Sequence, residues 1–125
     1  MIQASEFLEY AKQCVGKSEV ANRVAVSRAY YAVYHICWEI AILHGYNEYL
    51  KNTKFNCGEH EKLIKFYRHK NRQYIADKLR DLKYQRVNAD YKLEEIDCDT
   101  NTAKTTIKKV ERLIKLVEPF RTKPL

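Results

Sequence analysis

Residues 19–44, EVANRVAVSRAYYAVYHICWEIAILH, decide the fold that this chain predicts. Apolar side chains recur at helical spacing from Val20 to Ile40, and alanines lie among them, so the segment is apolar around much of its circumference. Such a helix is stable only when other helices surround it. Ser18 is a good N-cap residue, and Gly45 stands where helices commonly end on a glycine. We therefore expect one long central helix over 19–44.

The remaining patterns predict shorter helices around the central one. Residues 46–57 are expected to form a loop with at most one helical turn, and Pro119 is expected to end the last helix. The expected helices are 5–15 with Ser5 as its cap, 58–70, 71–87 as a separate helix or a continuation after a kink near Asn71, and a last one from Asp99 or Thr100 to Val117.

No strand pattern competes with these helices, and only three glycines and two prolines interrupt 125 residues. The expected fold is all-α: an up-and-down antiparallel bundle of four to five helices. We expect a single domain over 1–125, with the bundle at about 4–118 and a short C-terminal tail over 119–125.

The sequence has no pattern typical of a membrane span, a metal site or a disulfide framework. No apolar run reaches the ~20 residues of a membrane span, and the first residues do not have the pattern of a signal peptide. The four cysteines are dispersed, and the four histidines lack the spacing of a zinc site. We expect a cytoplasmic protein with reduced thiols and with no metal or cofactor.

The net charge of +7 is concentrated in residues 62–92, which hold ten Lys and Arg against three Asp, or 10 − 3 = +7. A local basic field favours a polyanionic partner, most often nucleic acid. The alternative is a solvated helix face that only aids solubility. The cations expected to bind nucleic acid are Lys65, Arg68, Arg72 and Arg80.

Arg28 and His35 form the most specific candidate pair. Seven residues are nearly two helical turns, so both side chains share one face about 10 Å apart along the axis, with Tyr31 between them. A histidine can act as general acid or base near pH 7 while an arginine holds a phosphate, as RNA cleavage requires. The alternative is a pair of structural hydrogen-bonding residues inside the bundle.

A second candidate string is QRVNADY, residues 85–91, where Arg86 ends a basic helix and Asp90 and Tyr91 follow in the turn. Asp90 is placed to pair with Arg86 or with Arg28. The alternative is an ion pair that only stabilises a helix end. His60, near the start of the expected third helix, is assigned to the surface or to a cap.

Three strings in this order resemble the small prokaryotic HEPN proteins: SRAYYAVYH, GEHEKLIKF and LxxLxxQRxxADY. The resemblance covers roughly residues 4–118, nearly the whole chain. The resemblance implies a helical bundle that forms a homodimer, often encoded beside a nucleotidyltransferase as toxin and antitoxin. Many such relatives are metal-independent ribonucleases whose site, an Arg-x4–6-His motif, is built across the dimer. Others lack the motif and bind nucleotides or partners.

The sequence departs from the ribonuclease pattern after Arg86, where Tyr91, Lys92 and Leu93 occupy the positions of the motif histidine. Arg28 and His35 fit the spacing but lie on an earlier helix. We therefore expect an RNA- or nucleotide-binding module in a toxin–antitoxin or defence system. The alternative is an active endoribonuclease with Arg28, His35 and Arg86 as catalytic residues. The expected ligand-binding residues are Arg28, Tyr31, Arg86, Asp90 and Tyr91.

Overall fold

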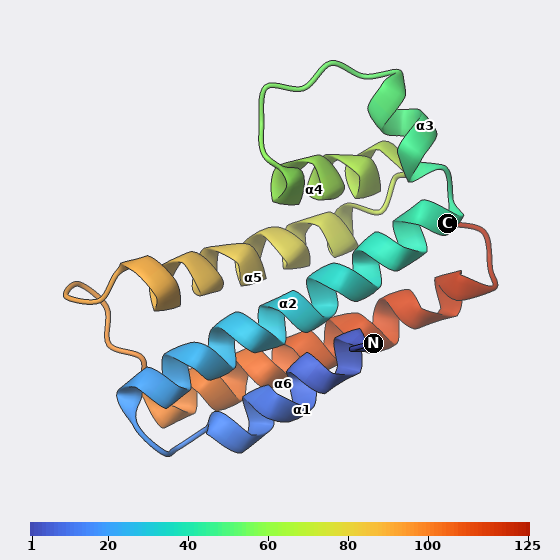
Figure 1. The fold of residues 1–125 in the computed structure, drawn as a ribbon. Coiled ribbons are helices and arrows are strands. Elements are labelled where there is room, and N and C mark those ends of the chain that lie inside the picture. Colours follow the sequence, from blue (N-terminus) through green and yellow to red (C-terminus); the bar gives the residue numbers. More distant parts are fainter.

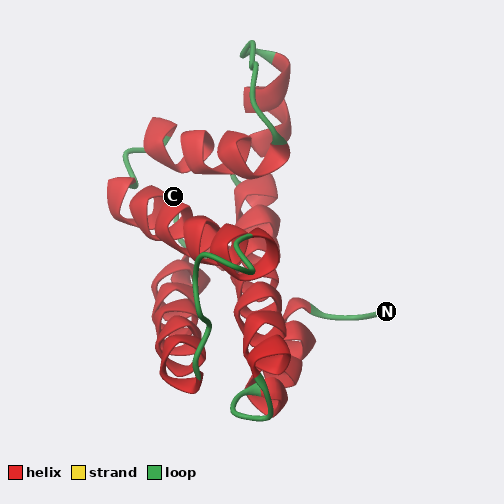
Figure 2. Cartoon of the chain, turned by 90° about the vertical axis from the view of Figure 1, so that its left-hand side faces the viewer, coloured by secondary structure: helices red, strands yellow, loops and turns green.

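A computed structural model describes all 125 residues, and it contains helices and no strand. The all-α prediction is therefore confirmed. Figures 1 and 2 show the bundle from two sides. The elements are α1 (Ala4–Cys14), α2 (Glu19–Leu43), α3 (Tyr46–Lys51), α4 (Glu59–His69), α5 (Gln73–Tyr91), α6 (Thr100–Val117) and a final 3-10 turn η1 (Glu118–Arg121).

Helix α2 is the centre of the molecule, as the sequence predicts, because it contacts every other helix. Four of its five alanines, Ala25, Ala29, Ala32 and Ala41, are fully buried, so neighbouring helices approach its backbone closely. The hydroxyl of Ser18 accepts from the Ala21 N–H in the first turn at 3.0 Å, and Gly45 takes the left-handed conformation (φ 88°) that ends the helix.

The order of the other helices is partly up-and-down. Helices α1 and α2, α4 and α5, and α5 and α6 run antiparallel, while the short α3 and the loop after it project at one end (Figure 1). Asn71 has a left-handed backbone (φ 62°), and there the chain turns back on itself. Helix α5 is therefore a separate helix packed on α4, and the alternative of a kinked continuation is wrong.

Helix α5 runs four residues beyond the predicted end at 87, so Asp90 and Tyr91 lie in its last turn and not in a loop. A residue of α2 stabilises this longer helix. The guanidinium of Arg23, 8% exposed, donates to the carbonyls of Asn88 (3.3 Å) and Ala89 (2.9 Å). These carbonyls belong to the end of a helix, where intrahelical partners are missing. A buried cation on the neighbouring helix therefore stabilises the last turn.

Both ends of the chain also differ from the prediction. Helix α1 is capped by Gln3 rather than Ser5, and the Gln3 N–H donates to Glu6 at 2.7 Å. Residues 118–121 form η1 instead of a free tail. His44 hydrogen-bonds to the Phe120 carbonyl at 2.6 Å, so the segment after α6 packs against the end of α2.

The segment 46–57 contains α3, six residues long, where at most one helical turn was expected. Tyr46, only 1% exposed, anchors this helix in the core. Burying a large side chain contributes roughly 1.5–3 kcal/mol, which stabilises a helix too short to persist alone. Tertiary packing, rather than local propensity, thus sets this element.

Three of the four cysteines are buried, and Cys57 is partly exposed. None of the helices combines the length and the apolarity that crossing a bilayer requires. The bundle covers most of the apolar surface of α2, and the large apolar side chains that this helix leaves exposed are Val20, Trp38 and Leu43.

Candidate functional site

Arg28, Tyr31 and His35 lie along one face of α2, as their spacing predicts. The guanidinium carbon of Arg28 is 5.1 Å from the centroid of the Tyr31 ring, a cation–π distance. The Tyr31 and His35 rings are stacked at 6.1 Å with an interplanar angle of 23°. Phe7 of α1 stacks on His35 at 6.0 Å and 16°, so a second helix fixes the imidazole.

Arg86 of α5 approaches the same face of α2. Its guanidinium carbon lies 5.7 Å from the centroid of Tyr30 and 5.8 Å from that of Tyr31. Two arginines, from α2 and α5, therefore approach the same Tyr31 ring. The Arg86 side chain is only 12% exposed, so its charge lies in a partly dehydrated setting between the helices.

Of the two possible partners Arg86 and Arg28, Asp90 pairs with Arg86. The carboxylate lies 3.5 Å from Nη1 of Arg86, at the long limit of a hydrogen bond, and also accepts from the Ser27 hydroxyl at 3.3 Å. Nε of Arg86 is buried and has no hydrogen-bond partner. A guanidinium has five N–H donors, so this one is incompletely satisfied by the protein itself.

His60 of α4 completes the group, although its place in the sequence predicted a surface or capping residue. Its Nδ1 is 2.7 Å from the Tyr30 hydroxyl, and its ring lies 4.3 Å from that of Tyr34. Burial, followed by the positive charges of Arg86 and Lys83, lowers the pKa of His60 below its ordinary value. Burial raises the pKa of Tyr30, so its hydroxyl stays protonated.

We call this group the Arg86 cluster: Arg28, Tyr30, Tyr31, Tyr34, His35, His60, Arg86 and Asp90. It combines two cations, two imidazoles and three phenol rings from α2, α4 and α5. At neutral pH the lowered pKa leaves the His60 ring uncharged. When the Tyr30 hydroxyl donates to Nδ1, the remaining ring proton of His60 sits on Nε2. The arrangement can hold an anion, stack against a flat ring and move a proton.

The other predicted binding residues are not part of the cluster. Tyr91 is 70% exposed at the end of α5. Arg68 pairs with Asp77 at 2.9 Å, and Arg80 pairs with Glu61 at 3.2 Å. Two of the four cations assigned to nucleic acid are therefore neutralised within the chain.

The remaining two cations differ from each other. The guanidinium carbon of Arg72 lies 4.6 Å from the centroid of the Phe120 ring, so this cation packs against η1. Lys65 is exposed on α4, with its ammonium 6.0 Å from the centroid of Phe55. Lys65 is thus the one most open to a partner.

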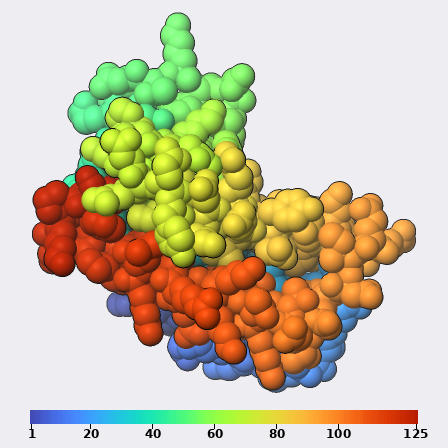
Figure 3. Space-filling model, turned by 180° about the vertical axis from the view of Figure 1, so that it is seen from behind, coloured from blue at the N-terminus to red at the C-terminus, as the bar shows by residue number.

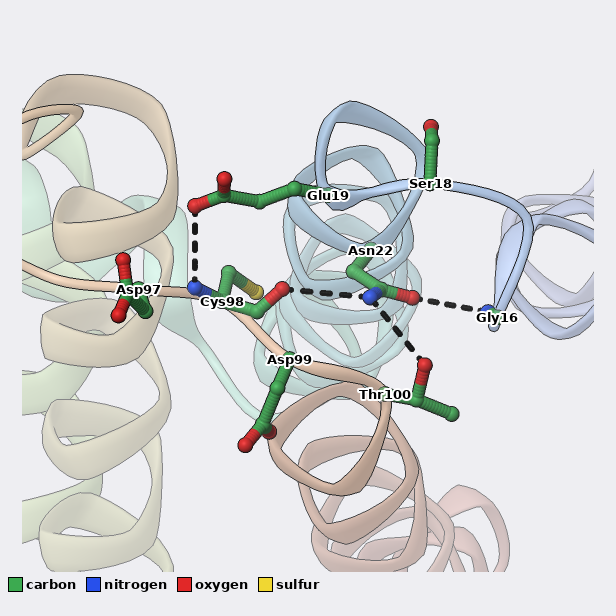
Figure 4. A pocket seen from close by; sticks show the side chains of 8 residues that line it. All are labelled: Gly16, Ser18, Glu19, Asn22, Asp97, Cys98, Asp99 and Thr100. Atoms are coloured by element: carbon green, nitrogen blue, oxygen red, sulfur yellow. Dashed lines mark hydrogen bonds between the residues drawn. The ribbon is translucent and has the colours of Figure 1, made fainter.

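An open depression of about 410 Å³ lies elsewhere, where the α1–α2 turn meets the connector before α6 (Figure 4). Asn22 joins the two loops: its side chain accepts from the Gly16 N–H at 2.8 Å and donates to the Cys98 carbonyl at 3.2 Å. The depression is lined by none of the predicted site residues. We assign its polar groups to holding the loops together.

No group of His, Cys, Asp and Glu side chains is arranged to hold a metal ion. Compared with known proteins, the chain matches no family model, no curated protein and no solved structure. The Arg86 cluster, with its two cations and its aromatic rings, is therefore the candidate functional site.

Proposed function

We propose that this chain is a HEPN-like RNA- or nucleotide-binding module, cytoplasmic and homodimeric, that acts with a nucleotidyltransferase-type partner in a toxin–antitoxin or defence system. The observation that carries the binding proposal is the incompletely satisfied guanidinium of Arg86. The family and its biological setting rest on the three sequence strings. The chemistry of binding rests on the cluster.

A phosphate group supplies the hydrogen-bond acceptors and the negative charge that the cluster lacks. The Arg86 guanidinium is a planar fork that matches two phosphate oxygens, and such charge-assisted bonds are stronger than neutral ones. Arg28 has no carboxylate within ion-pair distance and approaches the same Tyr31 ring. Asp90 alone offsets these two positive charges, so an anion between them reduces their mutual repulsion.

The aromatic rings favour a nucleotide over a bare phosphate. Tyr31, Tyr34 and His35 are partly exposed and contact one another through stacked or edge-on rings. An unpaired base can stack on such rings, a common mode in the recognition of single-stranded RNA. The phosphate then reaches the two arginines.

The test is binding of 5′-UMP and of a short oligouridylate, followed by calorimetry and fluorescence anisotropy. Charged hydrogen bonds contribute about 1.5–3 kcal/mol, so Arg86→Gln is expected to weaken binding about ten- to 150-fold. Arg121→Gln is the matched control, because Arg121 also pairs with a carboxylate but lies in η1. Equal affinity of Arg86→Gln and Arg121→Gln for both ligands contradicts the proposal.

A second candidate function is metal-independent RNA cleavage, favoured by the two histidines that contact Tyr34 beside Arg86. In this reaction a neutral histidine accepts the proton of the 2′-hydroxyl, whose oxygen attacks phosphorus. The 5′-oxygen leaves and takes a proton from an acid, and Arg86 offsets the charge on phosphate.

Cleavage of cellular RNA in excess EDTA distinguishes the enzyme from the binding module. For an enzyme, His60→Ala or His35→Ala lowers the rate by ~10²–10⁴, the usual contribution of general acid–base catalysis. Wild-type protein that binds RNA without cutting it leaves the binding module as the function. A thermal melt of each variant separates lost chemistry from lost folding.

A further inference from the structure

A second positive surface runs along the junction of α5 and α6, away from the Arg86 cluster. Two neighbouring depressions, of about 190 and 310 Å³, lie along this junction, and Lys109 lines both. Figure 3 views the molecule from the side where orange α6 crosses in front and yellow α5 lies above it. We call the two depressions together the α5–α6 groove.

Three cations of this groove are unpaired, unlike Arg68 and Arg80, and Arg80 itself lines the second depression while paired with Glu61. Lys78 of α5 and Lys109 and Arg112 of α6 line the first depression, and none has a carboxylate within 4 Å. The positive charge of α6 is not apparent when charges are summed over everything outside residues 62–92. Residues 100–117 hold five Lys and Arg against Glu111 alone, or 5 − 1 = +4, and Glu111 is paired with Lys12 at 3.1 Å.

Each depression also presents an exposed tyrosine. Tyr74 is 63% exposed and lines the first, and Tyr84 is 62% exposed and lines the second. The ammonium of Lys78 lies 5.2 Å from the centroid of the Tyr74 ring. A cation beside an exposed ring is the combination that holds a phosphate and stacks the adjoining base.

We propose that the α5–α6 groove binds the backbone of single-stranded RNA, an inference that rests on the nucleic-acid function proposed above. Tyr74 and Tyr84 are ten residues apart, about 15 Å along the helix, which spans several nucleotides. The phosphates lie against Lys78, Lys109 and Arg112. Asp81 is the carboxylate that lines the groove, in the second depression, so a base rather than a phosphate occupies that end.

Single-stranded RNA is favoured over a duplex or an acidic protein because of the two exposed rings. Stacking needs an unpaired base, and a duplex offers its phosphates but hides its base faces. An acidic protein would use the cations and leave the tyrosines without a flat partner. Strand preference and tyrosine dependence therefore separate the three classes of partner.

The first test compares two triple variants that lose the same charge. Lys78→Gln/Lys109→Gln/Arg112→Gln neutralises the groove, and Lys104→Gln/Lys108→Gln/Lys115→Gln neutralises three exposed lysines of α6 that line neither depression. Binding of labelled oligouridylate is measured by anisotropy over a range of salt. The groove variant is expected to flatten the log–log salt slope by about 2, since each lost phosphate contact removes about 0.7.

The second test removes the rings. Tyr74→Ala or Tyr84→Ala is expected to weaken binding of oligouridylate about five- to 150-fold, the range for loss of one stacked base. Tyr10→Ala, at another exposed tyrosine on α1, is the control and is expected to leave affinity unchanged. A matched RNA duplex is expected to bind more weakly than the single strand.

The outcomes separate this inference from the proposed function. Equal effects of the two triple variants, or equal affinity for strand and duplex, overturn the groove. When Arg86→Gln weakens binding and the groove variant does not, the groove is wrong and the Arg86 cluster stands. The reverse result overturns the cluster and supports the groove. Wild-type protein that does not bind oligouridylate overturns the groove outright.

Discussion

Arg23→Met is expected to destabilise the fold strongly, because the buried Arg23 side chain joins α2 to the last turn of α5 and to the connector after it. Methionine keeps an apolar stem of similar length and removes every donor. The Arg23 guanidinium is bonded to four backbone carbonyls and one carboxylate, those of Asn88, Ala89, Leu93, Ile96 and Glu19.

The expected loss follows from the number of strong bonds. A hydrogen bond to a charged group contributes about 1.5–3 kcal/mol, and the bonds to the Asn88 and Ala89 carbonyls are buried. Counting only these two gives roughly 3–6 kcal/mol, a large part of the ~5–15 kcal/mol of a small domain. Carbonyls left without donors in a buried place are costly in the same way.

Urea unfolding followed by circular dichroism measures the loss of free energy. Arg121→Met is the control, since Arg121 forms exposed pairs with Glu39 and Glu118 and is expected to cost about 0–1 kcal/mol. Arg23→Lys keeps the charge and is expected to fall between the two. Amide exchange at residues 88–92 is expected to rise in Arg23→Met. A loss for Arg23→Met no larger than that for Arg121→Met refutes the reasoning.

Three further predictions concern pH, thiols and assembly. The pKa of His60 is lowered in the fold, so the unfolded chain binds a proton at this residue before the folded chain does. Stability is therefore expected to fall as pH drops below about 6.5. His60→Gln is expected to flatten this dependence of the melting temperature on pH. Cys57 is expected to react with a thiol reagent well before Cys37, whose pKa burial raises, and mass spectrometry of the labelled protein gives the order. Light scattering at tens of micromolar is expected to show a dimer, and Trp38→Asp to shift it toward monomer; a monomeric wild type contradicts the dimer.

The sequence predicted those elements whose cause is local. Helix α2 follows from its own apolar pattern, the Ser18 cap and Gly45. The end of α5 does not, because the donor that stabilises it, Arg23, is 66 residues away from Ala89. No window along 71–91 contains that information. The same holds for α3, whose stability depends on the burial of Tyr46.

The candidate site was predicted in part for the same reason. Arg28, Tyr31 and His35 share a face because one helix carries them, and spacing alone reveals this. His60 reaches them through a bond to Tyr30, 30 residues away, and only its place in the HEPN-like string hinted at it.

The basic segment shows a different limit. Summing charges along the sequence cannot tell that Arg68 and Arg80 are paired. The same sum does not reveal that Lys109 and Arg112 of α6 lie beside Lys78 of α5, because residues distant in the sequence come together only in the fold.

The most direct test of the central claim, that the Arg86 cluster binds a phosphate, is an NMR titration that observes the arginine Nε–H groups. Nε of Arg86 is buried without a partner, so its signal reports on a ligand that arrives there. Adding 5′-UMP is expected to shift the Arg86 signal with saturation, together with the His60 ring, while the signal of Arg121 stays in place. A titration in which Arg86 and His60 do not shift, or shift no more than Arg121, contradicts the account.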